Sequence, residues 1–86
     1  MPNRMSFAQL ANVPRHLLAA TIERGRDRYP VRVKKIGIGH LVVGPAPLAL
    51  LERARFTIHC PLSDVSCRVE LVAVRKNADT TWLVPV

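Results

Sequence analysis

A cluster of basic side chains is the group of residues best suited to bind a ligand. Six Lys and Arg residues lie between positions 24 and 35, opposed only by Asp27: Arg24, Arg26, Arg28, Arg32, Lys34 and Lys35. The planar guanidinium group of arginine forms paired hydrogen bonds with phosphate oxygens and with the edge of guanine. The cluster therefore predicts an anionic, nucleotide-like ligand. A solvated charged surface that binds nothing specific is the alternative.

The predicted ligand-binding residues are the arginines of this cluster and the tyrosine beside them. Tyr29 offers an aromatic face on which a base can stack, or else it covers the edge of the core. The full set is Arg24, Arg26, Arg28, Tyr29 and Arg32.

The charge of the whole chain supports this location. The 86 residues carry a net charge of +7. Residues 1–40 hold eight basic and two acidic groups, an excess of six, whereas residues 41–86 hold five and four, an excess of one. A chain of this length forms one small domain, which excludes most multi-step enzymes.

Catalysis and metal binding are not predicted. The serines lie in no Gly-x-Ser-x-Gly motif, and no glycine-rich phosphate loop is present. Cys60 and Cys67 are spaced unlike a zinc knuckle, so we interpret them as core thiols, and we predict no metal and no cofactor. A disulfide between them becomes feasible only if they lie opposite one another in a hairpin.

No membrane span or signal peptide is expected. The apolar run from Pro45 to Leu51 is the longest, far below the roughly 18–20 residues that a spanning helix needs. The first residues contain no uninterrupted apolar region, so we expect a cytoplasmic protein.

The elements that must position the basic cluster are a helix and a set of short strands. Residues 14–24 are predicted to form an amphipathic helix that Gly25 ends. Strands are expected from Tyr29 onward, with a bulge or register slip at Lys34-Lys35. Residues 44–47 form a loop, and residues 48–54 are either a short helix or an irregular connection.

The second half of the chain predicts a hairpin and a last strand. Phe56, Ile58 and Cys60 alternate with polar residues, and Cys67, Val69 and Leu71 do the same after a turn. A final strand at 80–84 contains Trp82, which is either a core residue or an exposed platform for stacking. The fold class is therefore mostly β, a small antiparallel barrel of about five or six strands. It forms one domain, with an N-terminal arm and helix at 1–25 and the barrel at 26–86.

The segment from Arg24 to Val31 resembles the opening of PilZ domains, small β-barrels that bind the cyclic dinucleotide c-di-GMP. These domains begin with Arg-x-x-x-Arg, matched here by Arg24 and Arg28, followed by Pro-Val, matched by Pro30-Val31. The resemblance implies that the two arginines clasp the phosphates and a guanine of the ligand. It also implies a role in signalling.

The family's second motif, Asp/Asn-x-Ser-x-x-Gly, is incomplete in this chain. Its nearest match runs from Asp64 through Ser66 to Val69, which stands where the family has glycine. With this gap, the resemblance implies a divergent PilZ-like regulatory module that binds c-di-GMP weakly or acts through protein contacts. The main rival is a small basic β-barrel that binds nucleic acid, and a protein-docking module is the third class.

Overall fold

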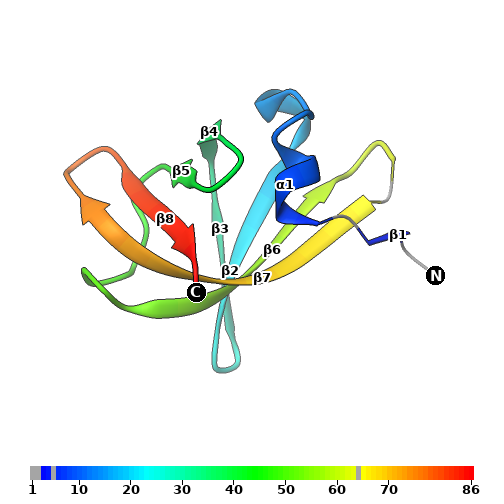
Figure 1. Cartoon of the computed structure of the whole chain (residues 1–86). Helices are drawn as coiled ribbons and strands as arrows, with labels where there is room; N and C mark the ends of the chain where they lie inside the picture. The colour runs from blue at the N-terminus through cyan, green and yellow to red at the C-terminus, as the bar shows by residue number, and fades with distance from the viewer. Residues whose placement is uncertain (1–2, 5, 64) are drawn as a thin grey trace.

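The computed structural model describes residues 3–4, 6–63 and 65–86, and most of them belong to β-strands (Figure 1). Two short helical elements precede the main sheet, α1 (Phe7–Leu10) and the 3-10 turn η1 (Arg15–Leu17). The strands are β1 (Asn3–Arg4), β2 (Ala19–Arg24), β3 (Asp27–Val31), β4 (Val33–Ile36), β5 (Leu41–Val43), β6 (Arg53–Cys60), β7 (Val65–Lys76) and β8 (Thr81–Pro85).

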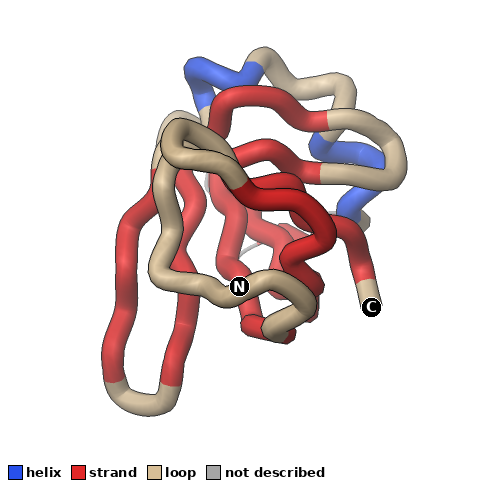
Figure 2. The backbone as a smooth tube through the Cα atoms, turned by 90° about the vertical axis from the view of Figure 1, so that its left-hand side faces the viewer, coloured by secondary structure: helices blue, strands red, loops and turns tan. Residues whose placement is uncertain are grey.

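Seven strands form one antiparallel sheet in the order β3-β2-β6-β7-β8-β5-β4, and β1 adds a short parallel pairing with the start of β7. The sheet curls into a half-barrel (Figures 1 and 2). Its two ends, β3 and β4, are consecutive in the chain and joined by Arg32 alone. Within the part of the chain that the structure describes, no backbone pairing joins them, so the barrel stays open along this seam. The mostly β fold class is confirmed.

The hairpin predicted in the second half is the centre of the sheet. β6 and β7 pair over eight residue positions from Arg53 opposite Val72 to Cys60 opposite Val65. The burial of β6 alternates as expected, because Phe56, Ile58 and Cys60 point into the core. Both edges of this hairpin are paired, β6 with β2 and β7 with β8.

The predicted helix over residues 14–24 is wrong, and the sheet extends N-terminally beyond the expected boundary at residue 26. Only η1 is helical in this stretch, and β2 follows it as a strand between β3 and β6. Leu18, Ala20 and Ile22 are buried at every second position, which is the period of a strand. Pairing with β6 on one side and β3 on the other overrides the helical propensity of the segment.

The core fills the concave side of the sheet, and α1 covers part of it (Figure 1). Leu10 of α1 is fully buried in this core beside side chains from the strands. A capping box between Ser6 and Gln9 satisfies the first backbone N–H groups of the helix, which is why so short a helix can form.

Two irregularities shape the ends of the sheet. The bulge expected at Lys34-Lys35 is present, because the pairing of β4 with β5 shifts between Val33 and Lys35. The connection at 48–54 contains no helix: it is a turn that leads directly into β6, and Leu51 in it has a φ of 67°. No helix in the described residues is long and apolar enough to cross a membrane.

Candidate ligand-binding site

The two arginines of the Arg-x-x-x-Arg motif do not converge. They flank the β2–β3 turn, in which Gly25 has a φ of 62°. Arg24 closes β2 opposite Asp27, whereas Arg28 lies in β3 opposite Glu23. Because neighbouring residues of a strand point to opposite faces, Glu23 and Arg24 face opposite ways, and Arg28 shares the face of Glu23. Arg24 and Arg28 therefore lie on opposite faces of the hairpin.

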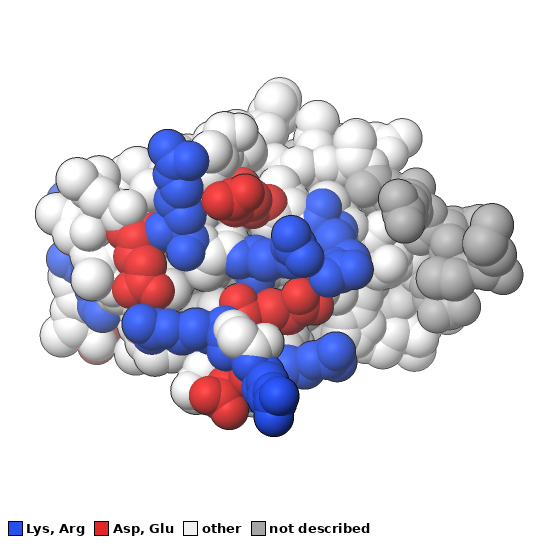
Figure 3. Space-filling model, turned by 90° about the horizontal axis from the view of Figure 1, so that it is seen from below, with Lys and Arg blue, Asp and Glu red and all other residues white. Residues whose placement is uncertain are grey.

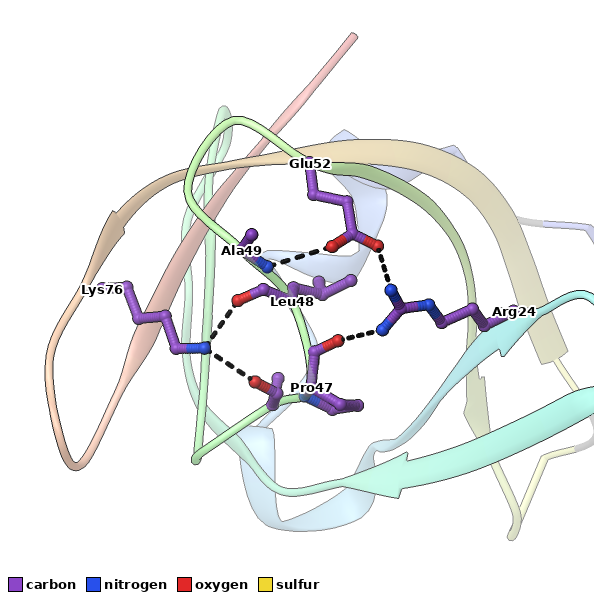
Figure 4. Close-up of polar contacts among 7 residues, drawn as sticks. Arg24, Pro47, Leu48, Ala49, Glu52 and Lys76 are labelled. Atoms are coloured by element: carbon purple, nitrogen blue, oxygen red, sulfur yellow. Dashed lines mark hydrogen bonds and ion pairs between the residues drawn. The ribbon is translucent and has the colours of Figure 1, made fainter.

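Arg24 is engaged by the loop that precedes β6 (Figure 4). Its guanidinium group donates a hydrogen bond to the carbonyl oxygen of Pro47 and forms an ion pair of 3.3 Å with the carboxylate of Glu52. The other carboxylate oxygen of Glu52 accepts a hydrogen bond from the backbone N–H of Ala49. Arg24 thus ties the end of β2 to this loop.

Lys76, at the end of β7, holds the same loop from the other side (Figure 4). Its ammonium group donates hydrogen bonds of 3.2 Å and 2.6 Å to the carbonyl oxygens of Ala46 and Leu48. These loop carbonyl groups form no hydrogen bond with a neighbouring strand, and the two cations satisfy them instead. Arg24 and Lys76 together fix the backbone of residues 46–52.

Arg28 belongs to a row of alternating charges on the outer face of the sheet. The strand registers align Arg28, Glu23, Arg55 and Glu70 across β3, β2, β6 and β7. Basic and acidic side chains are interleaved on the underside of the molecule (Figure 3). Such opposite charges on neighbouring strands neutralise one another, so this face offers an anion little net attraction.

Glu23 is the anchor of this row. Its carboxylate accepts hydrogen bonds from Arg68 at 3.0 Å and from Thr57 at 3.1 Å. Desolvation raises the pKa of Glu23, but these hydrogen bonds and the charges of Arg68 and Arg28 outweigh it, and the pKa lies below its ordinary value. Glu23 therefore stays ionised beside Arg28 and Arg68.

The other predicted residues, Arg26, Tyr29 and Arg32, lie at different places from the β2–β3 turn to the end of β3. Arg26 is exposed in the β2–β3 turn. Tyr29 lies opposite the buried Ile22, on the face that continues into the core, and 37 % of it is exposed. Arg32 lies at the far end of β3, at the open seam. The five predicted residues thus do not form one site.

A different set of cations surrounds a groove at the open seam. The groove has a volume of about 670 Å³. Its charged and titratable lining consists of Arg15, His16, Arg32 and Lys34, and its aliphatic lining of Leu18, Ala19, Val31 and Val33. Arg15 donates a hydrogen bond from its guanidinium group to the carbonyl oxygen of Lys34. We call these eight residues the basic groove.

Arg32 and Lys34 lie on the same side of the seam. Both side chains pass Gly44: a Cβ atom at Gly44 would lie 3.8 Å from Cβ of Arg32 and 3.9 Å from Cε of Lys34. A smaller hollow of about 420 Å³ adjoins the basic groove, shares Arg15 and Lys34 with it, and adds Lys35. Four of the eight basic residues of the first half of the chain therefore line these two hollows, without a carboxylate among the lining residues: Arg15, Arg32, Lys34 and Lys35.

The hollow beneath the β2–β3 turn differs in charge. It also has a volume of about 420 Å³, but Arg24, Arg53 and Arg55 in its lining are balanced by Glu23, Glu52 and Glu70. Since an anion is attracted by unpaired cations, the basic groove is the stronger candidate site.

The remaining chemical groups lie elsewhere in the sheet. Cys60 is opposite Val65, and Cys67 is opposite Ile58, so the two thiols are offset and not directly paired. Both are free and buried. Hydrogen bonding from Ser63 lowers the pKa of Cys60, and burial raises the pKa of Cys67. No group of three or more metal-ligating side chains occurs among the residues that the structure describes.

Trp82 is neither a free stacking platform nor a core residue. It is half-buried on β8, between His40 and Arg75. The rings of His40 and Trp82 stack with their centroids 5.5 Å apart, and the guanidinium group of Arg75 lies 5.9 Å from the centre of the indole ring. The indole therefore has close neighbours from two other segments of the chain.

The residues that partly match the second PilZ motif do not line the basic groove where the structure describes them. Asp64 lies outside the described residues. Ser66 is opposite His59, and Val69 is opposite the buried Phe56, both within the central hairpin. Comparison of the chain with protein families, with characterised proteins and with solved structures gives no match.

Proposed function

We propose that this protein is a non-enzymatic binding module for a small phosphate-bearing ligand, which it holds in the basic groove. The observation that carries the proposal is the gathering of Arg15, Arg32 and Lys34 around one groove whose lining contains no acidic side chain. Three cations at one opening favour an anion with several negative oxygens, as a phosphate group has.

In this proposal the charged side chains of the groove bind the phosphate, and its aliphatic side chains contact the rest of the ligand. Arg15 uses one N–H group on the carbonyl oxygen of Lys34 and keeps further donors for a ligand. Arg32 and Lys34 flank the opening from the strand side. The aliphatic lining suits the apolar face of a base or ribose beside the phosphate. Tyr29 lies on the same face of β3 as Val31, roughly 7 Å further along the strand, and adds an aromatic surface there.

The size of the groove favours a small molecule over a polynucleotide. Its volume falls within the range of about 300–1,000 Å³ that is typical of small-ligand sites. Single-stranded nucleic acid is more often held along an extended basic surface with several exposed aromatic residues. On the outer face of the sheet, the alternating row from Arg28 to Glu70 offers no such uniform surface.

A cyclic dinucleotide such as c-di-GMP is the ligand that we propose first, with a role as a regulatory, signalling module. Its support is the supply of cations at the seam, and the resemblance of residues 24–31 to PilZ domains suggests the class of ligand but not this site. In this proposal Arg32, Lys34 and Arg15 hold the phosphates. Arg24 and Arg28 do not line the basic groove: Arg24 binds the loop before β6, and Arg28 lies on the outer face of the sheet.

The test is a calorimetric titration of the full chain with c-di-GMP at low and at moderate salt. We expect saturable binding of one ligand that persists at moderate salt. Arg32→Ala and Lys34→Ala should each weaken it about tenfold or more, because each removes a charged hydrogen bond. Arg28→Ala is the matched control and should leave the affinity within a factor of about two, since Arg28 lies outside the groove.

Two other results would contradict the proposal. Loss of binding in Arg28→Ala but not in Arg32→Ala would place the ligand at the hairpin. Absence of heat with c-di-GMP, combined with tight, steeply salt-dependent binding of a single-stranded oligonucleotide, would identify a nucleic-acid-binding protein.

A further inference from the structure

The loop between β5 and β6 exposes an unusual amount of apolar surface. Residues 45–51 are all apolar and read Pro-Ala-Pro-Leu-Ala-Leu-Leu. Ala46 and Leu48 are buried in the core, while the remaining five residues of the run are exposed. We call Pro45–Leu51 the apolar loop. Contiguous exposed apolar surface of this kind marks an interaction site more often than a chance arrangement.

Two adjacent leucines form the outermost part of this surface. Leu50 is 57 % exposed and Leu51 is 69 % exposed. The backbone N–H of Leu51 donates to the carbonyl oxygen of Ala73, which brings the loop alongside Val74, itself 43 % exposed. Leu51 also adopts a φ of 67°, in the left-handed region that favours glycine. An exposed leucine is therefore kept in an unfavourable conformation where glycine would be accommodated more easily.

The apolar loop is held rigidly and not left to move freely. Arg24 binds the carbonyl oxygen of Pro47, and Lys76 binds those of Ala46 and Leu48 (Figure 4). The carboxylate of Glu52 accepts a hydrogen bond from the backbone N–H of Ala49. A loop ordered in this way loses little conformational entropy when it is buried by a partner.

Positive charge surrounds the exposed leucines. Arg53 lies two residues after the loop, beyond Glu52, and Arg75 follows Val74; both arginines are exposed. Lys76 adds a further cation where it ties the loop backbone, whereas the charge of Arg24 is compensated by its ion pair with Glu52. Glu70 lines one hollow with Arg53, so Arg75 and Lys76 are the cations near the leucines that lie outside this charge-balanced hollow. Exposed aliphatic side chains next to exposed cations match the interface of an anionic lipid bilayer, where apolar chains lie beneath negative headgroups.

We propose that the apolar loop docks on anionic lipid membranes, with Leu50 and Leu51 inserted into the interface and Arg53 and Arg75 against the headgroups. A protein partner fits less well. The exposed apolar residues of the loop and Val74 number only six, whereas each side of a stable protein interface contributes roughly 20–30 residues. The carbonyl oxygens of Ala46, Pro47 and Leu48 and the N–H of Leu51 already have partners within the chain.

The test is co-sedimentation of the full chain with vesicles of phosphatidylcholine alone or mixed in equal parts with phosphatidylglycerol. We expect binding to the mixed vesicles that weakens with salt, and little binding to phosphatidylcholine alone. Leu50→Ser and Leu51→Ser should each weaken binding about tenfold or more. Leu62→Ser is the matched control, because Leu62 is 83 % exposed at the other end of β6 and should not affect binding.

The charge is tested with Arg53→Gln and Arg75→Gln, each compared with Arg28→Gln on the β2–β3 hairpin. We expect the first two variants to weaken binding to the mixed vesicles more than the third. Thermal melting of every variant checks that the fold is retained. Failure of the wild-type chain to bind mixed vesicles, or an equal loss in Leu62→Ser, would overturn the proposal. Self-association that Leu50→Ser abolishes, without lipid binding, would instead identify the loop as a contact between copies.

Discussion

Arg24 and Arg28 lie on opposite faces of the β2–β3 hairpin although only three residues separate them in the chain. Arg24 reaches the loop before β6, and Arg28 lies in the charged row with Glu23. A pair of arginines at this spacing can clasp one ligand from a loop or a helix. Across a tight hairpin turn the same spacing separates them, and each acquires a different structural neighbour.

Replacing Arg24 should destabilise the protein. In Arg24→Ala the free energy of unfolding should fall by about 1–2 kcal/mol, because a hydrogen bond to Pro47 and the ion pair with Glu52 are lost. Thermal unfolding should show a decrease in Tm of several degrees. Arg26→Ala in the exposed turn is the control and should change Tm little; equal effects of the two variants would contradict the role of Arg24.

Lys76 should be required for the same loop. Lys76→Met keeps most of the aliphatic stem but removes both hydrogen bonds to the carbonyl oxygens of Ala46 and Leu48. We expect a loss of about 1–2 kcal/mol in urea unfolding, with an unchanged m-value. Lys35→Met, in an exposed position on β4, should be close to neutral. A neutral Lys76→Met would show that the loop is held without this lysine.

Glu23 should make stability depend on acidic pH. Its pKa in the folded state lies below its ordinary value of 4.5, so the unfolded chain takes up the proton first as the pH falls. Its contribution is complete above about pH 5 and is lost as the pH falls through the folded pKa. Urea unfolding between pH 6 and pH 3 should be less pH-dependent in Glu23→Gln, and also in Arg68→Gln, which removes its ion-pair partner. An unchanged slope in both variants would refute this assignment.

The two thiols should differ in reactivity. Cys60 and Cys67 are similarly buried, at 7 % and 6 % exposed, but Ser63 lowers the pKa of Cys60 while burial raises that of Cys67. Because the thiolate is the reactive form, iodoacetamide should alkylate Cys60 first under native conditions. Peptide mapping measures the order. Ser63→Ala should slow the reaction at Cys60, and earlier modification of Cys67 would contradict the prediction.

The strands could be predicted from the sequence wherever the alternation of side chains is strong. Phe56, Ile58 and Cys60 identified β6 and its buried face, and the paired lysines identified the bulge in β4. These features are local, because the alternation of apolar and polar residues within a strand indicates its buried and exposed faces without information from the rest of the chain. The number of strands was underestimated, because β2 was assigned to a helix.

The error at β2 has a physical origin. Residues 15–24 contain several good helix formers, and a proline near the start suits a first helical turn. The alternation of Leu18, Ala20 and Ile22 is the competing signal, but Ala20 is too small to make it prominent. Pairing with β6 decides the outcome, and the nearest residues of that partner lie more than thirty positions away in the chain.

The candidate site was predicted only in part for the same reason. Arg32 was among the predicted residues, and Lys34 was recognised as part of the basic cluster. Arg15 was placed in a helix, so its hydrogen bond to Lys34, nineteen residues away, could not be anticipated. Which arginines are already paired with Glu23 or Glu52 also depends on strand register, which composition does not encode.

The central hairpin sets an order of assembly for the chain. β6 and β7 are joined by a short turn, so their pairing closes only a small loop and can form early. β2 must bring Ala20 to Ile58, and β5 must bring Leu41 to Leu83, across much longer stretches of chain. We therefore expect folding to begin at β6–β7 and the outer strands to join afterwards, so that the two edges of the open seam, β3 and β4, take their positions last.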